Sequence, residues 1–331
     1  MALLVQTPSL RNLTGCDTHS QMQLDLIIPT YNRSEQLPRV FESLRDATIP
    51  AGLEVRVLVV DNNSTDRTRY VVADETRLWG GRMRYVLEPK QGKSYALNTA
   101  IQQTSGELIG IFDDDQEMDP GWFNAIVEAF KQADLDFISG PVKPRWDYVA
   151  MPEWFPQNYR AVIGWVDGGE QVCEFGSADY EGIMTGGNSV MRRRVIERIG
   201  HYDTRLGRTN INLLGGEDQD FYERMLAAGC RGQYRPDLVM HFQVAANRLT
   251  KKYYRDWCHW NGVSLGLMDR ARPKPIAYFL GVPRFLFKRA LAGLFEQIKA
   301  PFTKPNPSAL FARELAVRHW IGYFYGKHFF K

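Results

Sequence analysis

Short apolar runs alternate with amphipathic stretches over the first two thirds of the chain. A nearly continuous apolar run is typical of a strand buried in a parallel sheet, and such runs lie at 24–28, 55–60, 83–87 and 108–112. Apolar residues at helical spacing predict helices that cover 37–44, 94–103 and 120–131. Ser34 is placed to be the N-cap of the first helix. Strands and helices in this alternating order predict an α/β sandwich with a mostly parallel sheet.

The regular pattern breaks between 140 and 182, where Pro, Trp and Tyr are frequent. Long irregular insertions in compact domains are commonly lids or binding surfaces, so we expect this segment to face the substrate. Regular structure returns with a predicted strand at 185–191 and a helix at 194–199. A further helix is predicted to begin near Glu217 and to stop at Gly229, which places acidic residues at the positive end of its dipole.

The C-terminal part of the chain becomes aromatic and basic. A helix over 285–298 would carry charged side chains on one face and, on the other, an apolar stripe made of Leu286, Phe287, Ala290, Leu291, Leu294 and Ile298. Such a helix can lie on an anionic membrane surface, as a possible peripheral contact, or it can pack against the rest of the protein. The sequence leaves both interpretations open.

These patterns predict three parts of the chain. Residues 1–21 are expected to be a flexible tail, 22–255 a main domain, and 256–331 an amphipathic, aromatic and basic extension. The tail lacks the long apolar core of a signal peptide. No apolar run reaches the roughly 18 residues of a membrane-spanning helix, so we do not expect the protein to be integral to a membrane.

Composition narrows the class of protein further. Hydrophobic residues make up 44% of the chain, which is enough for a real core. The formal net charge is +3, from 41 basic and 38 acidic residues, which is too balanced to indicate a nucleic-acid partner. The widely spaced cysteines lack metal-ligand spacing and fit reduced thiols in the cytoplasm.

The fourth predicted strand ends in three consecutive carboxylates, Asp113, Asp114 and Asp115. Like charges at this spacing raise one another's pKa unless a cation lies among them. Carboxylate oxygens suit Mg²⁺ or Mn²⁺, and Mg²⁺ often completes its coordination with waters and substrate phosphates. A calcium loop of the EF-hand kind is excluded, because its sixth and twelfth positions would need Gly and Glu and hold Met118 and Asn124.

Polar segments follow two other predicted strands at the same point. Thr30-Tyr31-Asn32-Arg33 comes after the first strand, and Asp61-Asn62-Asn63 comes after the second. In open α/β sheets, ligands bind outside the carboxyl ends of the strands. We therefore expect these segments and the three carboxylates to meet at one edge of the sheet.

Six motifs occur in a fixed order along the chain. They are Ile28-Pro29-Thr30-Tyr31-Asn32-Arg33, the stretch from Val59 to Asp66, Gly92-Lys93-Ser94 with Asn98, Asp113-Asp114-Asp115 with Pro120, Gly186-Gly187-Asn188, and Gly216-Glu217-Asp218. Their order and spacing resemble the signature of family 2 glycosyltransferases, over about residues 22 to 245. The resemblance implies a GT-A fold, a three-layer α/β/α sandwich, in the main domain, with a C-terminal helical extension.

The resemblance also implies a reaction, the inverting transfer of a sugar from a nucleotide-sugar donor to a hydroxyl of a glycan or lipid-linked acceptor, with Mg²⁺ or Mn²⁺. It implies donor binding by Pro29, Thr30, Tyr31, Asn32, Arg33, Asp61, Asn63, Gly92, Lys93, Asn98, Asp113 and Asp114. Within that set, Asp61 would accept a hydrogen bond from the nucleobase. The acceptor side is implied to include Gly187, Asn188 and Glu217.

The family pattern assigns the chemistry to a few carboxylates. Asp115 would be the direct metal ligand, supported by Asp113, and His241 is a further candidate ligand. Asp218 would be the general base for the acceptor hydroxyl, and Glu217 would orient the acceptor or shift the pKa of Asp218. The residues alone leave simpler roles open: dipole stabilisation at a helix start for the acidic pair, and a structural hydrogen bond for His241.

Two other classes of protein share parts of this pattern. A sugar nucleotidyltransferase would also have an α/β nucleotide site, but it should carry a glycine-rich basic loop after its first strand, where this chain has Pro29-Thr30-Tyr31-Asn32. A catalytically inactive nucleotide-sugar-binding relative is disfavoured because both Asp115 and Asp218 are present. The expected setting is cytoplasmic, possibly peripheral on the cytoplasmic face of a membrane where a polysaccharide, lipid-linked glycan or glycolipid is built.

Overall fold

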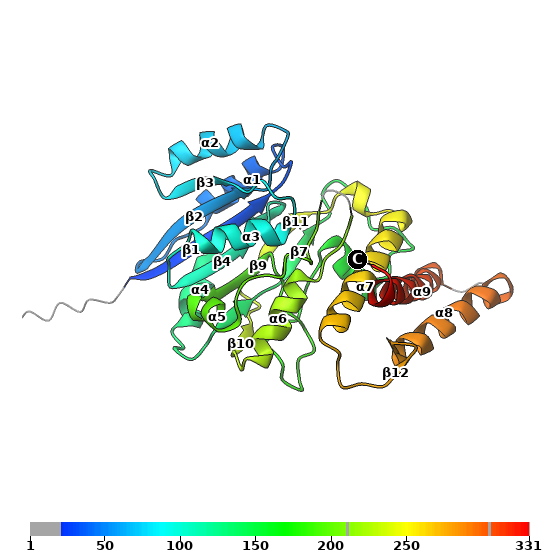
Figure 1. The fold of residues 1–331 in the computed structure, drawn as a ribbon. Helices are drawn as coiled ribbons and strands as arrows, with labels where there is room; N and C mark the ends of the chain where they lie inside the picture. The colour runs from blue at the N-terminus through cyan, green and yellow to red at the C-terminus, as the bar shows by residue number, and fades with distance from the viewer. Residues whose placement is uncertain (1–20, 210–211, 304–305, 331) are drawn as a thin grey trace, which may run out of the picture.

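The computed structural model describes residues 21–209, 212–303 and 306–330. Its central sheet consists of β1 (Met22–Thr30), β2 (Leu53–Asp61), β3 (Met83–Leu87), β4 (Leu108–Phe112), β6 (Phe137–Ser139), β8 (Cys173–Glu174), β9 (Asn188–Arg192) and β10 (Gly232–Tyr234). The strand order is β3-β2-β1-β4-β9-β6-β10-β8 (Figure 1). The first four strands pair in parallel, whereas β9 is antiparallel to both β4 and β6.

Helices cover both faces of this sheet. They are α1 (Leu37–Asp46), α2 (Thr68–Leu78), α3 (Lys93–Gln102), α4 (Trp122–Phe130), α5 (Arg193–Ile199) and α6 (Glu217–Ala227). Successive residues of β1 point to opposite faces, so Leu26 packs with α1, α2 and α4, and Ile27 packs with α3, α5 and α6. Both side chains are fully buried. The predicted three-layer α/β/α sandwich is therefore confirmed.

A smaller sheet lies beside the main one. It joins β5 (Gln116–Met118), β11 (Met240–Gln243) and β7 (Val142–Arg145). The segment expected to be irregular, 140–182, contains only β7, β8 and the 3₁₀ helix η1 (Gln157–Ile163). A second 3₁₀ helix, η2 (Ala246–Arg248), follows β11.

The predicted cap of the first helix is wrong. Gln36, not Ser34, precedes α1, and its side chain makes no capping bond. The backbone N–H of Ser34 donates instead to Asp66 Oδ2 at 3.0 Å. A carboxylate is a stronger acceptor than a neutral oxygen, so the loop after β1 is tied to the loop after β2 before the helix begins.

The C-terminal part forms α7 (Lys251–Ala271), the hairpin of β12 (Tyr278–Phe279) and β13 (Val282–Pro283), and helices α8 (Arg284–Thr303) and α9 (Pro307–His328). Figure 1 shows α9 between α7 and α8 at one end of the molecule. Among the described residues, no helix is both long and apolar enough to cross a membrane. The expected boundary at 255/256 falls inside α7, and the predicted tail lies almost wholly outside the described residues. The division into domains stays a prediction.

Glycines allow α7 and α9 to pack closely. Gly262 and Gly266 of α7 face α9, and Gly322 and Gly326 of α9 face α7. A Cβ added at Gly262 would lie 2.2 Å from the carbonyl oxygen of His319, well inside any real contact. A Cβ at any of the four positions would clash with the backbone of the opposite helix, so the two helices pack backbone against backbone.

Candidate active site

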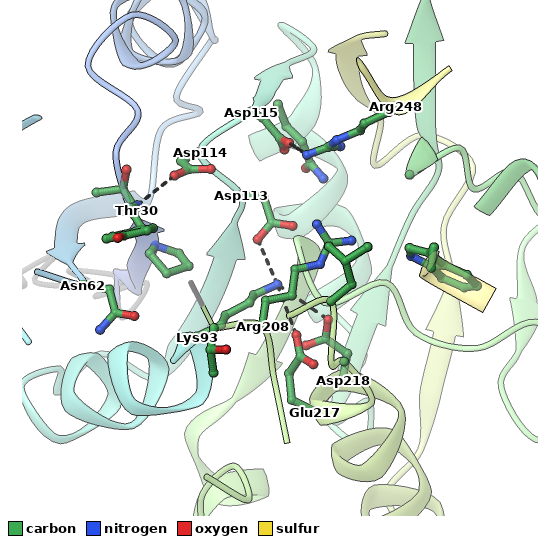
Figure 2. A pocket seen from close by; sticks show the side chains of 18 of the residues that line it. Thr30, Asn62, Lys93, Asp113, Asp114, Asp115, Arg208, Glu217, Asp218 and Arg248 are labelled. Carbon is green, nitrogen blue, oxygen red and sulfur yellow. Dashed lines mark hydrogen bonds and ion pairs between the residues drawn. The ribbon is translucent and has the colours of Figure 1, made fainter. Parts of the chain in front are cut away.

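A cavity of about 500 Å³ opens at the carboxyl ends of β1 and β4 (Figure 2). Many of the predicted site residues line it: Pro29, Thr30, Tyr31, Arg33, Lys93, Asp113, Asp114, Asp115, Glu217 and Asp218. They come from segments far apart in the sequence. For the loop after β1 and the three carboxylates, the expectation that the polar segments meet at one edge of the sheet is confirmed.

Pairing of β1 with β4 brings the polar segment after β1 and the carboxylates after β4 together. The strands are parallel neighbours, so the loop after β1 lies beside the carboxylates after β4. The backbone N–H of Tyr31 donates to Asp114 Oδ2 at 3.3 Å, and Arg33 Nε lies 3.4 Å from Asp114 Oδ1. Burial raises the pKa of Asp114 to about 7, although Arg33 opposes the shift. Asp114 is therefore held against the loop that follows β1.

Lys93, at the start of α3, joins the two acidic groups of the cavity. Its Nζ lies 3.1 Å from Asp113 Oδ1, 3.6 Å from Asp218 Oδ2 and 3.8 Å from Glu217 Oε1. Figure 2 shows the ammonium pointing between Asp113 and the pair from α6. Burial would lower the pKa of Lys93, but these carboxylates raise it well above its ordinary value. Lys93 is therefore charged in the free protein, and it is not a surface lysine, since its side chain is only 19% exposed.

Asp218 has a raised pKa and an oxygen without a hydrogen-bond donor. Burial raises the pKa of Asp218 to about 7; Lys93 opposes this, and Glu217 and Asp113 add to it. Its Oδ1 is buried and accepts no hydrogen bond in the structure. A buried acceptor without a donor is costly, so this oxygen is a natural partner for a ligand hydroxyl.

Two adjacent glycines leave the space that the carboxylates occupy. A Cβ added at Gly186 would lie 2.0 Å from Asp218 Cγ, and one added at Gly187 would lie 2.1 Å from Asp113 Oδ2. The backbone N–H of Asp113 also donates to the carbonyl of Gly187 at 3.3 Å. Gly187, predicted on the acceptor side, thus lies beneath Asp113 and outside the cavity lining.

Asp115 forms ion pairs with two arginines. Arg248 Nη2, from η2, lies 2.8 Å from Asp115 Oδ2, and Arg33 Nη2 lies 3.9 Å from the same oxygen. Burial alone would raise the pKa of Asp115, but Arg248 and Arg33 lower it. Because both contacts use Oδ2, neither occupies Oδ1. Asp115 is thus a charged carboxylate whose Oδ1 is not used by either arginine.

The described residues contain no cluster of three or more His, Cys, Asp or Glu side chains arranged to hold a metal. The cavity carboxylates therefore do not form a metal site in which the protein supplies every ligand. They do fit a hard cation such as Mg²⁺ that takes one or two carboxylates and completes its coordination with phosphates and waters. Asp115 and Asp113 are the carboxylates suited to that role.

Some predicted donor residues do not line the cavity: Asn32, Asp61, Asn63, Gly92 and Asn98. The carboxylate of Asp61 accepts from the hydroxyl of Tyr85 and from the N–H of Ser64, both at 2.8 Å. The side chain of Asn98 exchanges two hydrogen bonds of 2.9 Å with the backbone of Tyr202. In the free protein the side chains of Asp61 and Asn98 thus join neighbouring segments, and the part of all five residues in donor binding stays a prediction.

Asn188 and His241 also lie outside the lining. Asn188 is fully buried: its Oδ1 accepts from Trp122 Nε1 at 2.9 Å, and its Nδ2 donates to two backbone carbonyls at 2.7 and 3.0 Å. His241 Nε2 lies 3.7 Å from Asp119 Oδ2. Burial and Arg145 lower the pKa of His241. The acceptor-side role of Asn188 and the metal role of His241 stay predictions.

Other lining residues were not predicted, among them Gln91, Arg208, Phe242, Trp257 and Asn261. Arg208 lies in a loop that docks on the start of α3. The Lys93 N–H donates to the Arg208 carbonyl at 3.1 Å, and Ser94 Oγ donates to the Leu206 carbonyl at 2.6 Å. The sequence of this loop has no periodicity that predicts its position. The polar residues Lys93 and Ser94 at the start of α3 were the only sequence signal that another segment would bind there.

Comparison with known proteins gives the class. The model of the family described as "Glycosyl transferase family 2" matches residues 25–200, which is more than half of the chain. The chain therefore belongs to glycosyl transferase family 2, and it is a nucleotide-sugar glycosyltransferase. This assignment removes the nucleotidyltransferase alternative.

Individual proteins are similar over most of their length. The succinoglycan biosynthesis protein ExoM of Rhizobium meliloti is 25% identical, over 71% of this chain and 72% of its own. The glucosyl-dolichyl phosphate glucuronosyltransferase of Haloferax volcanii is 25% identical, over 76% and 79%. The structure of the mannosyltransferase PcManGT from Pyrobaculum calidifontis, in complex with GDP-Man and Mn²⁺, superposes with a TM-score of 0.55 at 20% identity, covering 91% of this chain and 83% of that one. The predicted GT-A fold is confirmed.

Proposed function

We propose that this protein transfers a sugar from a nucleoside diphosphate sugar to an acceptor hydroxyl, with inversion and with a divalent cation. One observation carries the proposal: Lys93 holds Asp113 and Asp218, from opposite walls, within one cavity. A carboxylate for the leaving group's cation and a carboxylate for the attacking hydroxyl are the two acidic groups that such a transfer needs.

The donor half of the cavity is built for a diphosphate. Positive charge comes from Arg33, Lys93, Arg208 and Arg248, all of which line the cavity. Asp115 and Asp113 would hold Mg²⁺ or Mn²⁺, which when bound stabilises the charge on the leaving nucleoside diphosphate. The Mn²⁺ and GDP-Man in the PcManGT complex support this arrangement. Arg248 would then exchange Asp115 for phosphate oxygens.

The acceptor half would place a hydroxyl against Asp218. Its Oδ1 has no donor in the free protein, so the hydroxyl would satisfy it and lose its proton to it during attack on the anomeric carbon. A pKa of about 7 suits this task, because the carboxylate is then basic yet largely ionised just above neutral pH. Glu217, 3.8 Å from Lys93, would keep the lysine and base aligned. A single in-line attack gives inversion.

The relatives support a membrane-linked or polymeric glycan as acceptor. One acts in succinoglycan biosynthesis and another is named for a glucosyl-dolichyl phosphate. We propose that the enzyme acts peripherally on the cytoplasmic face of a membrane, with 22–255 as its catalytic domain and 256–331 as an extension.

The test is a panel of nucleotide sugars with Mn²⁺, in which nucleoside diphosphate release and donor binding are both measured. We expect turnover of at least one donor, loss of binding and turnover in Asp115→Ala, and retained binding without turnover in Asp218→Asn. Asp134→Ala is the matched control, because this carboxylate is exposed and lies outside the cavity. The proposal fails if Asp115→Ala reacts like wild type, or if NMR shows retained anomeric configuration. Donor binding without turnover in wild type would indicate an inactive relative.

A further inference from the structure

Helix α8 carries two different apolar faces. Leu286, Ala290 and Gly293 are buried, and a Cβ added at Gly293 would lie 2.5 Å from a backbone carbonyl of α9. This face packs on α9. A second set remains exposed and follows helical spacing i, i+3, i+4, i+7 and i+11: Leu291, Leu294, Phe295, Ile298 and Phe302. The stripe predicted from the sequence is thus divided between packing and solvent.

The exposed set, here called the α8 stripe, is unusual for a water-facing surface. Ile298 is 68% exposed and Phe302 is 87% exposed. The neighbouring β12–β13 hairpin adds Phe279 and Leu280, which are 55% and 65% exposed. Single exposed apolar side chains are ordinary, but a contiguous group marks an interaction surface.

Charge identifies the partner. Between Arg270 and Thr303 the chain has seven basic residues and one acidic residue, Glu296. Arg272 and Lys274 form ion pairs with Asp220 and Glu223 of α6, which leaves five basic residues against one acidic residue, a net charge of +4. All seven basic side chains are exposed, and Lys288 and Lys299 flank the α8 stripe. A cationic, apolar helix of this kind matches the interface of an anionic bilayer, where basic groups meet headgroups and apolar groups enter the acyl boundary.

The surface is fixed relative to the active site. Helix α8 packs on α9, and α9 is interlocked with α7 through the glycines described above. Helix α7 in turn contributes Trp257 and Asn261 to the cavity lining. A membrane bound by α8 would therefore hold the cavity in a set orientation.

We propose that the α8 stripe, with Phe279 and Leu280, lies in the plane of an anionic lipid surface and presents the cavity to an acceptor anchored in that surface. The acceptor part rests on the proposed function; the lipid binding does not. No described helix can span a bilayer, so α8 lies on the surface.

The test is sedimentation of the full-length protein with vesicles of phosphatidylcholine containing about 30 mol% phosphatidylglycerol, and with phosphatidylcholine alone. We expect binding to the anionic vesicles, weakened roughly tenfold or more by Ile298→Glu with Phe302→Glu. Lys288→Glu with Lys299→Glu should remove the preference for anionic lipid. The control is Tyr70→Glu with Leu78→Glu, on α2, whose side chains are equally exposed and whose loss should change nothing.

The proposal is overturned if the wild type does not bind the vesicles, or if the stripe variant binds them as well as the wild type does. It is also overturned if neither protein binds vesicles and light scattering shows that the wild type is a dimer and the stripe variant a monomer. The last would make the stripe an interface between two copies of the chain. Nucleoside diphosphate release in the absence of lipid should be the same in wild type and stripe variant, which shows that the site is intact. Because vesicle binding needs no turnover, failure of the proposed reaction and failure of this inference are distinguishable.

Discussion

Gly186→Ala tests whether the base depends on the space that glycine leaves. The new Cβ would lie 2.0 Å from Asp218 Cγ, whereas real Cβ atoms essentially never approach other atoms closer than 3.0 Å. Asp218 or the backbone must therefore move by about 1 Å or more. The backbone at Gly186 is not in the left-handed region, so steric overlap is the only new cost.

The size of the effect follows from that displacement. A misplacement of about 1 Å commonly costs about 10²-fold in rate, and overpacking a filled site costs about 1–3 kcal/mol of stability. We expect kcat to fall about a hundredfold. Donor binding should change little, because Asp115 and Arg248 lie on other segments and the nearest atoms to the new methyl group belong to Asp218.

The assay combines steady-state kinetics, donor calorimetry and urea unfolding. Gly121→Ala is the control, because it lies outside the cavity lining and its Cβ would find its nearest neighbour, Asp119 Oδ1, at an ordinary 3.4 Å. In the Asp218→Ala background the clashing atoms are absent, so adding Gly186→Ala should cost no further activity and little stability. A Gly186→Ala enzyme with wild-type kcat, or a double variant as destabilised as Gly186→Ala alone, would refute the reasoning.

In a pH–rate profile, kcat/KM for the acceptor should fall as the pH drops below about 7, because the raised pKa of Asp218 leaves the base protonated there. Lys93→Met removes the positive charge that opposes this shift, so it should move the acidic limb of the profile to higher pH. Arg248→Ala should bind Mn²⁺ alone roughly tenfold tighter in an EPR titration, because Asp115 loses a competing cation; weaker binding would contradict this. Asn188→Leu should lower the free energy of unfolding in urea by about 3 kcal/mol, through loss of its three buried hydrogen bonds.

The sheet and its acidic edge could be predicted because the signals for them lie in short, continuous stretches of sequence. Strands buried on both faces need continuous apolar runs, and such runs fix where β1, β2 and β4 end. Parallel pairing then brings the ends together whatever lies between them. Asp113 and the loop after β1 could therefore be placed in one site before any contact was known.

Residues whose role depends on distant packing could not be predicted. Arg208 lies in a loop without periodicity, and Trp257 lies on a helix whose orientation is set by its glycine contacts with α9. Motif residues can also be present for backbone reasons: Asn32 and Asn63 have φ of 53° and 65°, and Asn tolerates this left-handed region better than most residues. A motif therefore locates a residue in the sequence, but it does not tell whether the residue serves through its side chain or through its backbone conformation.

Gly187 shows how that ambiguity can be resolved. If it serves the acceptor side, as its motif implies, Gly187→Ala should raise the KM for acceptor and leave donor binding unchanged. The structure favours another role, because the added Cβ would lie 2.1 Å from Asp113 Oδ2 and Gly187 does not line the cavity. Displacing Asp113 should weaken donor and Mn²⁺ binding together, whereas Gly186→Ala should spare both and lower kcat. Opposite effects from adjacent glycines would show that this pair separates the donor-side carboxylate from the base.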